Sequence, residues 1–212
     1  MNIRWIKTPR WVKYFFPQLI WDGPKKEKVV YLTFDDGPTP EITEWVMDQL
    51  DCYGFKATFF LIGDNLRKYP EIGKKIVKKK HAIGNHTFNH WNGWRYATTD
   101  YLENSRQCTQ EIEAKLELKC SLFRPPYGKI KPSQIRQLRK KGYSIIMWDI
   151  LTYDWDNSKS PDFCLNTITK NIQPGSIIVF HDSKKASGNL KVVLPKALEY
   201  LSKNGYRSEK LT

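Results

Sequence analysis

Short runs of apolar residues alternate with helix-length amphipathic segments along most of this chain. The apolar runs lie at residues 29–34, 57–62, 82–83, 143–148 and 176–180. Parallel strands need a long crossover between them, usually a helix, so this alternation predicts an α/β fold with a parallel sheet, either open or closed into a barrel. Helix starts are predicted at Thr39, followed by Pro40, and at a capping box formed by Asp100 and Glu103.

The length, the net charge and the cysteine content of the chain narrow the possible domain organisation and partners further. The 212 residues fit one domain with a sizeable core. The formal net charge of +13 would attract nucleic acid, anionic lipid or an anionic glycan, although a solvated lysine-rich surface explains it equally well. The 4 cysteines are dispersed, which excludes a zinc ribbon or a C-x-x-C redox motif and predicts free, mostly buried thiols.

Residues 1–27 form an arm that differs in composition from the rest. Aromatic and basic residues are interleaved there, namely Trp5, Trp11, Phe15, Phe16 and Trp21 with Arg4, Lys7, Arg10 and Lys13. We find no apolar stretch typical of a signal peptide or a membrane-spanning helix. The arm is expected to pack on or beside a domain of residues 28–212, or to touch a membrane surface peripherally. Its prolines favour packing, because they interrupt an amphipathic helix.

Charged residues follow the apolar runs at the points where strands should end. Asp35 and Asp36 come directly after residues 29–34, and His181 follows residues 176–180. The carboxyl ends of parallel strands meet at one edge of a sheet or one rim of a barrel, where α/β proteins build their sites. A single site that includes these side chains is therefore predicted.

The histidine pair His86 and His90 predicts a metal site. The four-residue spacing puts both imidazoles on one side of a helix or tight turn, although two ordinary polar histidines would show the same spacing. A carboxylate such as Asp36 would complete a set of two histidines and one aspartate that leaves coordination positions open, as in catalytic sites.

The remaining groups would then divide the proton transfers between them. Asp35 is the expected base for an attacking water, and His181 is the expected acid, with its pKa tuned by Asp154. Arg124 is expected to hold Asp35 by bidentate hydrogen bonds and keep it ionised. Considered alone, His181 could equally be a hydrogen-bonded histidine at the end of a strand, and Arg124 could equally be a surface arginine.

Five motifs in order resemble those of the NodB-homology polysaccharide deacetylases, carbohydrate esterase family 4. They are Thr33-Phe34-Asp35-Asp36-Gly37, His86-Thr87-x-x-His90, Arg124-Pro125-Pro126-Tyr127-Gly128, Asp154-Trp155 and Val179-x-His181-Asp182. The resemblance covers nearly the whole chain from Lys28 to Tyr206. It implies a single-domain distorted barrel of about seven strands, a (β/α)7 barrel related to the TIM barrel.

The resemblance also assigns roles. Asp35 would be the base, Arg124 its partner, His181 the acid tuned by Asp154, and Asp36, His86 and His90 the ligands of a divalent metal, most often zinc. The backbone N–H of Tyr127 would stabilise the oxyanion. Substrate contacts are expected from Pro125, Tyr127, Trp155, Val179 and Trp91. Val179 stands where leucine is usual, and Trp91 would stack on a pyranose ring or pack against the barrel rim.

The predicted function is removal of acetyl from an N-acetylglucosamine-containing polysaccharide or oligosaccharide, which is chitin-like or peptidoglycan-like. The net charge of the chain leaves both a neutral and an anionic glycan open as substrate. An O-acetyl esterase acting on xylan or another glycan is the nearest alternative. A non-catalytic glycan-binding protein would not need Asp35, Arg124 and His181 together. A nucleic-acid-binding protein would explain the charge, but no nucleic-acid motif accompanies it, so no nucleic acid is expected as a partner.

Overall fold

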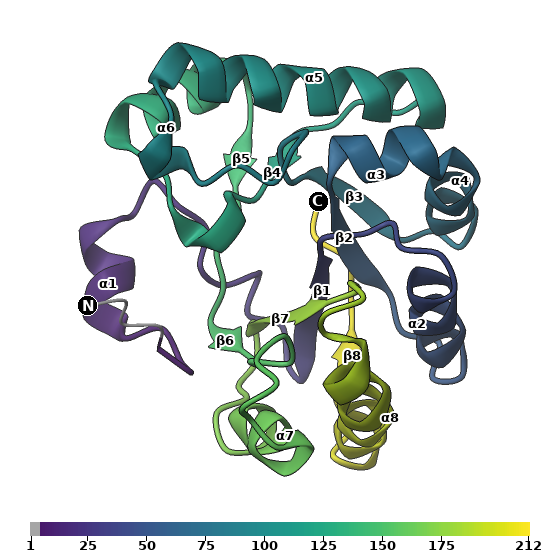
Figure 1. Ribbon diagram of the computed structural model, residues 1–212. Helices are drawn as coiled ribbons and strands as arrows, with labels where there is room; N and C mark the ends of the chain where they lie inside the picture. Colours follow the sequence, from purple (N-terminus) through teal and green to yellow (C-terminus); the bar gives the residue numbers. More distant parts are fainter. Residues whose placement is uncertain (1–4) are drawn as a thin grey trace.

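The computed structural model describes residues 5–212, and Arg4 of the arm lies outside them. Its parallel sheet curls into an incomplete barrel with helices outside, which confirms the predicted fold class (Figure 1). The strands are β1 Val29–Asp35, β2 Ala57–Leu61, β3 Ala82–Asn85, β4 Leu122–Phe123, β5 Ser144–Ile145, β6 Ile150–Leu151, β7 Ile177–His181 and β8 Arg207–Ser208. The α-helices are α1 Arg10–Phe15, α2 Ile42–Asp51, α3 Gly63–Lys68, α4 Pro70–Lys78, α5 Thr98–Leu116, α6 Pro132–Lys140, α7 Pro161–Thr169 and α8 Ser187–Lys203, with 3-10 turns η1 Gly93–Arg95 and η2 Pro126–Gly128.

The strand order places the ends of β1, β3, β4 and β7 around one opening. The order is β5-β4-β3-β2-β1-β7-β6, and β8 pairs with the start of β1. Asp35 is in register with His181 of β7, and Asn85, which precedes His86, is in register with Phe123, which precedes Arg124. Parallel pairing alone therefore brings the polar residues that follow these strands to one rim.

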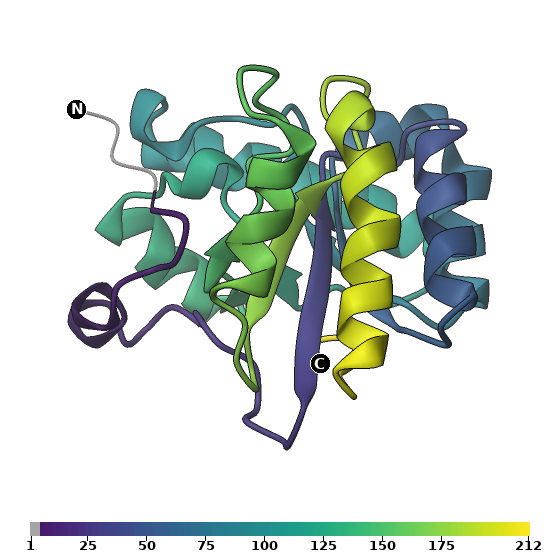
Figure 2. The same cartoon turned by 90° about the horizontal axis from the view of Figure 1, so that it is seen from below.

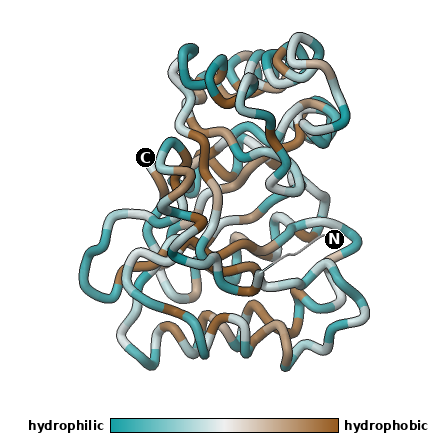
Figure 3. The backbone as a smooth tube through the Cα atoms, turned by 90° about the vertical axis from the view of Figure 1, so that its left-hand side faces the viewer, coloured by the Kyte–Doolittle hydropathy of each residue, from teal (hydrophilic) through white to brown (hydrophobic). Residues whose placement is uncertain are grey.

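Alternation along the strands separates two layers of core. In β1, Val30, Leu32 and Phe34 face outward and pack with buried residues of α2 and α8, whereas Val29 and Tyr31 belong to a smaller cluster inside the barrel. Figure 2 shows α7, α8 and α2 side by side along the outside of the strands. In Figure 3 hydrophobic stretches run through the middle of the molecule, and many of the outer turns are hydrophilic.

The arm lies between the two ends of the sheet. Isolated bridges join Lys7 to Ile150, beside β6, and Ile20 to Ile146, beside β5. The Ile20 N–H donates to Ile145 O at 2.9 Å, and the Thr8 N–H donates to Asp149 O at 2.8 Å. The arm thus pairs with backbone groups that the two terminal strands would otherwise leave open.

Both predicted helix starts are wrong. Helix α2 begins at Ile42, three residues after Thr39, and α5 begins at Thr98, so Asp100 lies inside its first turn. Glu103 pairs with Arg106 along the helix instead of capping it. The prediction of free and mostly buried cysteines is confirmed, since only Cys52 of the four is exposed. No described helix is both long and apolar enough to cross a bilayer.

Candidate active site

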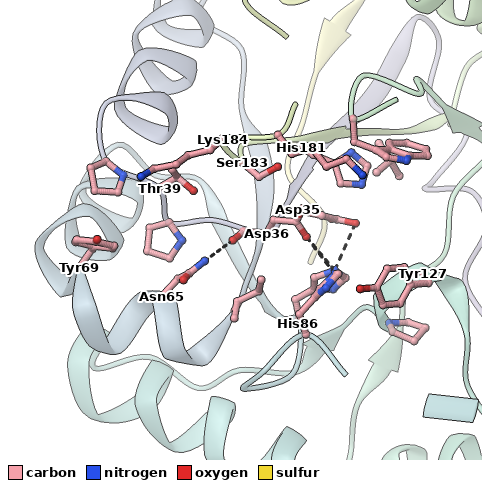
Figure 4. A pocket seen from close by; sticks show the side chains of 18 of the residues that line it. Asp35, Asp36, Thr39, Asn65, Tyr69, His86, Tyr127, His181, Ser183 and Lys184 are labelled. Carbon is pink, nitrogen blue, oxygen red and sulfur yellow. Dashed lines mark hydrogen bonds and ion pairs between the residues drawn. The ribbon is translucent and has the colours of Figure 1, made fainter. Parts of the chain in front are cut away.

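Two adjacent carboxylates end β1, and the backbone turns both toward the opening. Residues next to each other in a strand point to opposite faces, so regular geometry would send Asp36 away from Asp35. Asp36 has φ of 83°, however, in the left-handed region that follows the strand. Figure 4 shows the two side chains directed toward His86. The side chain of Asn65 donates to the Asp36 carbonyl at 2.8 Å and supports this turn.

Asp36, His86 and His90 come together as the sequence predicts. The three offer ligand atoms within 4.8 Å of one another. Asp36 Oδ1 lies 3.2 Å from His90 Nε2 and 3.8 Å from His86 Nε2. Tetrahedral zinc with bonds of about 2 Å separates its ligands by roughly 3.3 Å, which these spacings approach. The histidines lie on a turn rather than a helix, with positive φ at Thr87 and His90.

The protonation of His86 and of Asp36 also suits the binding of a cation. His86 Nδ1 lies 2.7 Å from the Arg124 carbonyl, so it carries the proton there and leaves the Nε2 lone pair facing Asp36. Burial lowers the pKa of His86 to about 4, which keeps it neutral as a ligand must be. Burial would raise the pKa of Asp36, but a contact with His90 and the charge of His181 hold it below its ordinary value. Asp36 Oδ1 is buried and accepts no well-aligned hydrogen bond, as expected of an atom reserved for a metal.

Asp35 is held by a buried arginine. The Arg124 side chain is fully buried, and its Nη1 donates to Asp35 Oδ1 and to Thr33 Oγ1, each at 2.7 Å. The expected bidentate contact is wrong, because Nη2 donates to the Met147 carbonyl at 2.9 Å instead. The guanidinium also lies 4.1 Å from the ring of Phe60, which fixes its plane. Arg124 therefore contacts only Oδ1 of Asp35, and Oδ2 lies 4.0 Å from His86 Nε2.

His181 is paired with Asp154 on the other side of the opening. Its Nδ1 lies 2.9 Å from Asp154 Oδ1, and its backbone N–H donates to Oδ2 at 2.7 Å. Burial would lower the pKa of His181, but Asp154 outweighs it and raises that pKa to about 9. The ring of Trp155 packs against the imidazole with centroids 4.6 Å apart. His181 is therefore protonated at neutral pH, with Nε2 as its remaining donor.

These groups open into one cavity of about 620 Å³. Pro125, Tyr127, Trp155 and Val179 line it together with Asp35, Asp36, His86, His90 and His181. Arg124 and Asp154 lie behind Asp35 and His181. Trp91 is not among the lining residues, because it stacks on Tyr96 with ring planes 2° apart and centroids 3.8 Å apart. The structure thus brings together every predicted site residue except Trp91.

Sequence reasoning did not single out several residues of the site. Asp182 is fully buried, accepts hydrogen bonds from the Gly37 N–H and the Thr43 hydroxyl, and so holds the loop after Asp36. A Cβ on Gly37 would come within 2.1 Å of Asp182, so the loop requires glycine there. Lys68, Lys184 and Lys185 line the cavity. Asp182 sits in a recognised motif, but nothing in the sequence indicates which partner it has.

Comparison with known proteins agrees with this geometry. Residues 22–146 match the family model described as polysaccharide deacetylase. The chain is 39% identical over 162 residues to a peptidoglycan-N-acetylglucosamine deacetylase of Bacillus cereus, covering 76% of this chain and 58% of that relative. It is 33% identical over 161 residues to a chitooligosaccharide deacetylase of Azorhizobium caulinodans, covering 74% and 75%.

A solved structure shares the whole fold. The peptidoglycan N-acetylglucosamine deacetylase Bc1960, solved with a substituted N-hydroxybenzamide, superposes with a TM-score of 0.87 at 32% identity and covers 96% of this chain and 95% of its own. With the five motifs gathered at one rim, the chain belongs to the polysaccharide deacetylase family, the NodB-homology hydrolases of carbohydrate esterase family 4.

Proposed function

We propose that this protein is a metal-dependent deacetylase that removes the N-acetyl group from an N-acetylglucosamine-containing polysaccharide or oligosaccharide and releases acetate. The relatives named above act on peptidoglycan or chito-oligosaccharides, which supports a glycan substrate. One observation carries the proposal. Asp35 and His181 each have a dedicated buried partner, and both face the cavity that holds the histidine and aspartate cluster.

In this proposal Asp36, His86 and His90 hold a divalent cation, with zinc as our choice. Zinc accepts nitrogen and oxygen ligands in this mixture, and three protein ligands leave a position for water or substrate. When bound, the cation supplies Lewis-acid polarisation of the acetyl carbonyl and acidifies water in the site. The buried Oδ1 of Asp36, which accepts no well-aligned hydrogen bond, and the Nε2 lone pair of His86 support this assignment.

Asp35 is the general base of the proposed reaction. Its Oδ2 accepts the proton of the water that attacks the acetyl carbon. The contact of Oδ1 with Arg124 fixes the orientation of the carboxylate during this transfer. The Tyr127 backbone N–H, in our proposal, donates to the oxygen that becomes negatively charged. Tyr127 has φ of 61°, so the backbone turns sharply at the cavity wall.

His181 is the general acid. An amine leaves an amide only after it gains a proton, and a histidine with a pKa of about 9 carries that proton at neutral pH. The protonated Nε2 would donate to the sugar nitrogen as the carbon–nitrogen bond breaks. Asp154 keeps the imidazolium oriented through Nδ1. This ready supply of a proton supports an amide substrate over an ester, whose alkoxide leaves with less help.

The cavity walls indicate how a sugar would be held. Trp155 offers an aromatic wall and Val179 an apolar one, suited to a pyranose ring and to the acetyl methyl. Lys184 and Lys185 line the cavity and are exposed, and neither forms an ion pair with a carboxylate among residues 5–212. We propose that they attract a carboxylate on a neighbouring sugar, so that the preferred glycan is anionic.

We further propose that residues 28–212 form the catalytic domain and that residues 5–27, the described part of the arm, pack on it. The backbone pairing of Ile20 with Ile145 and of Thr8 with Asp149 supports a single unit.

The test measures acetate release by the zinc-loaded protein from N-acetyl chito-oligosaccharides, from peptidoglycan and from acetylxylan. Acetate from either N-acetyl substrate, abolished in His181→Ala, is the expected result. Release from acetylxylan alone would establish the O-acetyl esterase instead. Saturable glycan binding without any acetate release would establish a non-catalytic protein.

A further inference from the structure

The arm presents a cluster of aromatic side chains to solvent. Four aromatic residues of α1 and the position after it are largely exposed, with Trp11 at 56%, Tyr14 at 80%, Phe15 at 67% and Phe16 at 44%. Elsewhere in residues 5–212, Trp94 is the only large hydrophobic residue more than half exposed. Contiguous exposed apolar surface of this kind marks a contact site rather than ordinary surface.

This exposure is not caused by a loose arm. Val12 of α1 is buried, and so is Leu19 just beyond the helix. Lys13 Nζ lies 2.7 Å from both Asp22 and the fully buried carboxylate of Asp149. The helix is therefore fastened by one face, and its aromatic face is held outward.

A basic helix, α6, adjoins the arm on the same side of the molecule as α1. Residues 129–141 contain no aspartate or glutamate, and Arg136, Arg139 and Lys140 of α6 are exposed. None of these three forms an ion pair within the part of the chain that the structure describes. Together with Gln18 of the arm they line one shallow groove, so the cations adjoin the arm directly. In Figure 1 both α1 and α6 lie on the left, the side that Figure 3 turns toward the viewer.

We propose that Trp11, Tyr14, Phe15, Arg136, Arg139 and Lys140 form a docking face, the α1–α6 face, that binds the surface of an anionic phospholipid bilayer. Tryptophan, tyrosine and phenylalanine are favoured at the boundary between headgroups and acyl chains. Lysine and arginine near such a surface each add roughly 1 kcal/mol of attraction, on the order of fivefold in the partition coefficient. The α1–α6 face thus supplies both the aromatic side chains that insert at the bilayer boundary and the positive charge that attracts anionic headgroups.

The packing of the aromatic rings favours lipid over other occupants. Trp11 meets Phe15 at 71° between ring planes, and Tyr14 meets Phe15 at 78°. Rings packed edge to face in this way make a compact apolar projection, whereas nucleic-acid bases and pyranose rings need open, flat ring faces for stacking. A second copy of the chain would bring the same unpaired cations of α6 together, which is unfavourable.

Co-sedimentation of the full chain with vesicles tests the proposal. Vesicles of phosphatidylcholine that contain phosphatidylglycerol as the anionic lipid are compared with vesicles of phosphatidylcholine alone. The triple variant R136Q/R139Q/K140Q should bind the anionic vesicles at least tenfold more weakly. The double variant W11A/F15A should lose binding to a similar extent, and added salt should weaken wild-type binding.

The control K78Q/K191Q/K196Q removes exposed lysines from α4 and α8, away from this face, and lowers the net charge of +13 by the same three units. It should bind the anionic vesicles within about twofold of wild type. Equal loss in control and test variants would overturn the proposal, because net charge alone would then drive binding. So would a shift of wild-type protein onto DNA with no vesicle binding, or a dimer in solution that W11A/F15A dissociates. Unfolding temperatures and acetate release from a soluble chito-oligosaccharide, unchanged in all three, show that the variants are folded.

Discussion

Replacing Asp154 by asparagine should move the alkaline limit of activity. Asp154 is the main group that raises the pKa of His181, from 6.5 to about 9 against the effect of burial. Asparagine has nearly the same shape and retains one acceptor oxygen, but it carries no charge. The pKa of His181 in Asp154→Asn is therefore expected to fall to 6.5 or below, because burial is then opposed only by weaker contributions.

The size of the effect follows from proton occupancy. At pH 7.5 a group with a pKa near 9 is about 97% protonated, and one with a pKa of 6.5 is about 10% protonated. Since activity requires the protonated histidine, it is present below the pKa and is lost as pH rises through it. At pH 7.5 kcat/KM should therefore drop at least tenfold, and the alkaline limb should move down by two pH units or more.

The assay is a pH profile of acetate release between pH 5 and 10, together with an NMR titration of the His181 ring. Asp162→Asn, at a carboxylate of α7 whose side chain is 83% exposed, is the matched control and should leave the profile unchanged. An unmoved alkaline limb in Asp154→Asn would refute the assignment of His181 as an acid tuned by Asp154. A His181 titration in the wild type near 6.5 would refute it independently.

Three further outcomes are expected. Lys13→Met should lower the free energy of unfolding by about 1–3 kcal/mol, measured by urea denaturation, since it removes a close cation from the buried carboxylate of Asp149. An unchanged midpoint would show that the Lys13–Asp149 ion pair adds no stability. The variant K184Q/K185Q should raise KM for a carboxylate-bearing glycan severalfold but leave KM for a neutral chito-oligosaccharide unchanged, and equal effects on both would contradict the proposed anionic preference. Chelation should lower the unfolding temperature and zinc should restore it, because a ligand at a hundred times its Kd stabilises the fold by roughly 3 kcal/mol; calorimetry that shows no shift would exclude a tight metal site.

The placement of site residues at the carboxyl ends of the strands was predictable from the sequence, because local hydrophobic patterns determine where the strands end. Runs such as residues 29–34 indicate a buried strand, and parallel pairing then leaves little choice about where Asp35 and His181 lie. The spacing of His86 and His90 likewise predicted one shared ligand site. These inferences needed only secondary-structure period and fold class.

Features that depend on contacts distant in sequence were not predictable. The pairing of Arg124 with Asp35 was predicted, but its geometry was not, because Nη2 donates to the carbonyl of Met147 instead of to Asp35. For Trp91 the sequence left two alternatives, stacking on a pyranose ring or packing against the barrel rim, and in the structure Tyr96 covers its ring face. The predicted caps failed as well: α2 begins only after Glu41, whose φ is 65°, and neither α2 nor α5 has a side-chain cap at its start.

The orientation of the arm also depends on contacts that the sequence did not predict. Its prolines and aromatic residues suggested either packing or membrane contact as alternatives. In the structure Val12 and Lys13 fasten the arm, while Trp11 and Phe15 of the same helix remain exposed. Only the rotation of α1 about its axis assigns the two faces, and six residues are too few for the sequence to define that rotation.

The central claim is that Asp35 acts as the base beside a metal held by its neighbour Asp36. Acetate release from N-acetyl chito-oligosaccharide, measured on Asp35→Asn whose zinc content has been determined, tests it most directly. The expected result is one zinc per chain, as in the wild type, with the rate lowered by about 100- to 10,000-fold. A variant that keeps its zinc and also keeps the wild-type rate would contradict the claim.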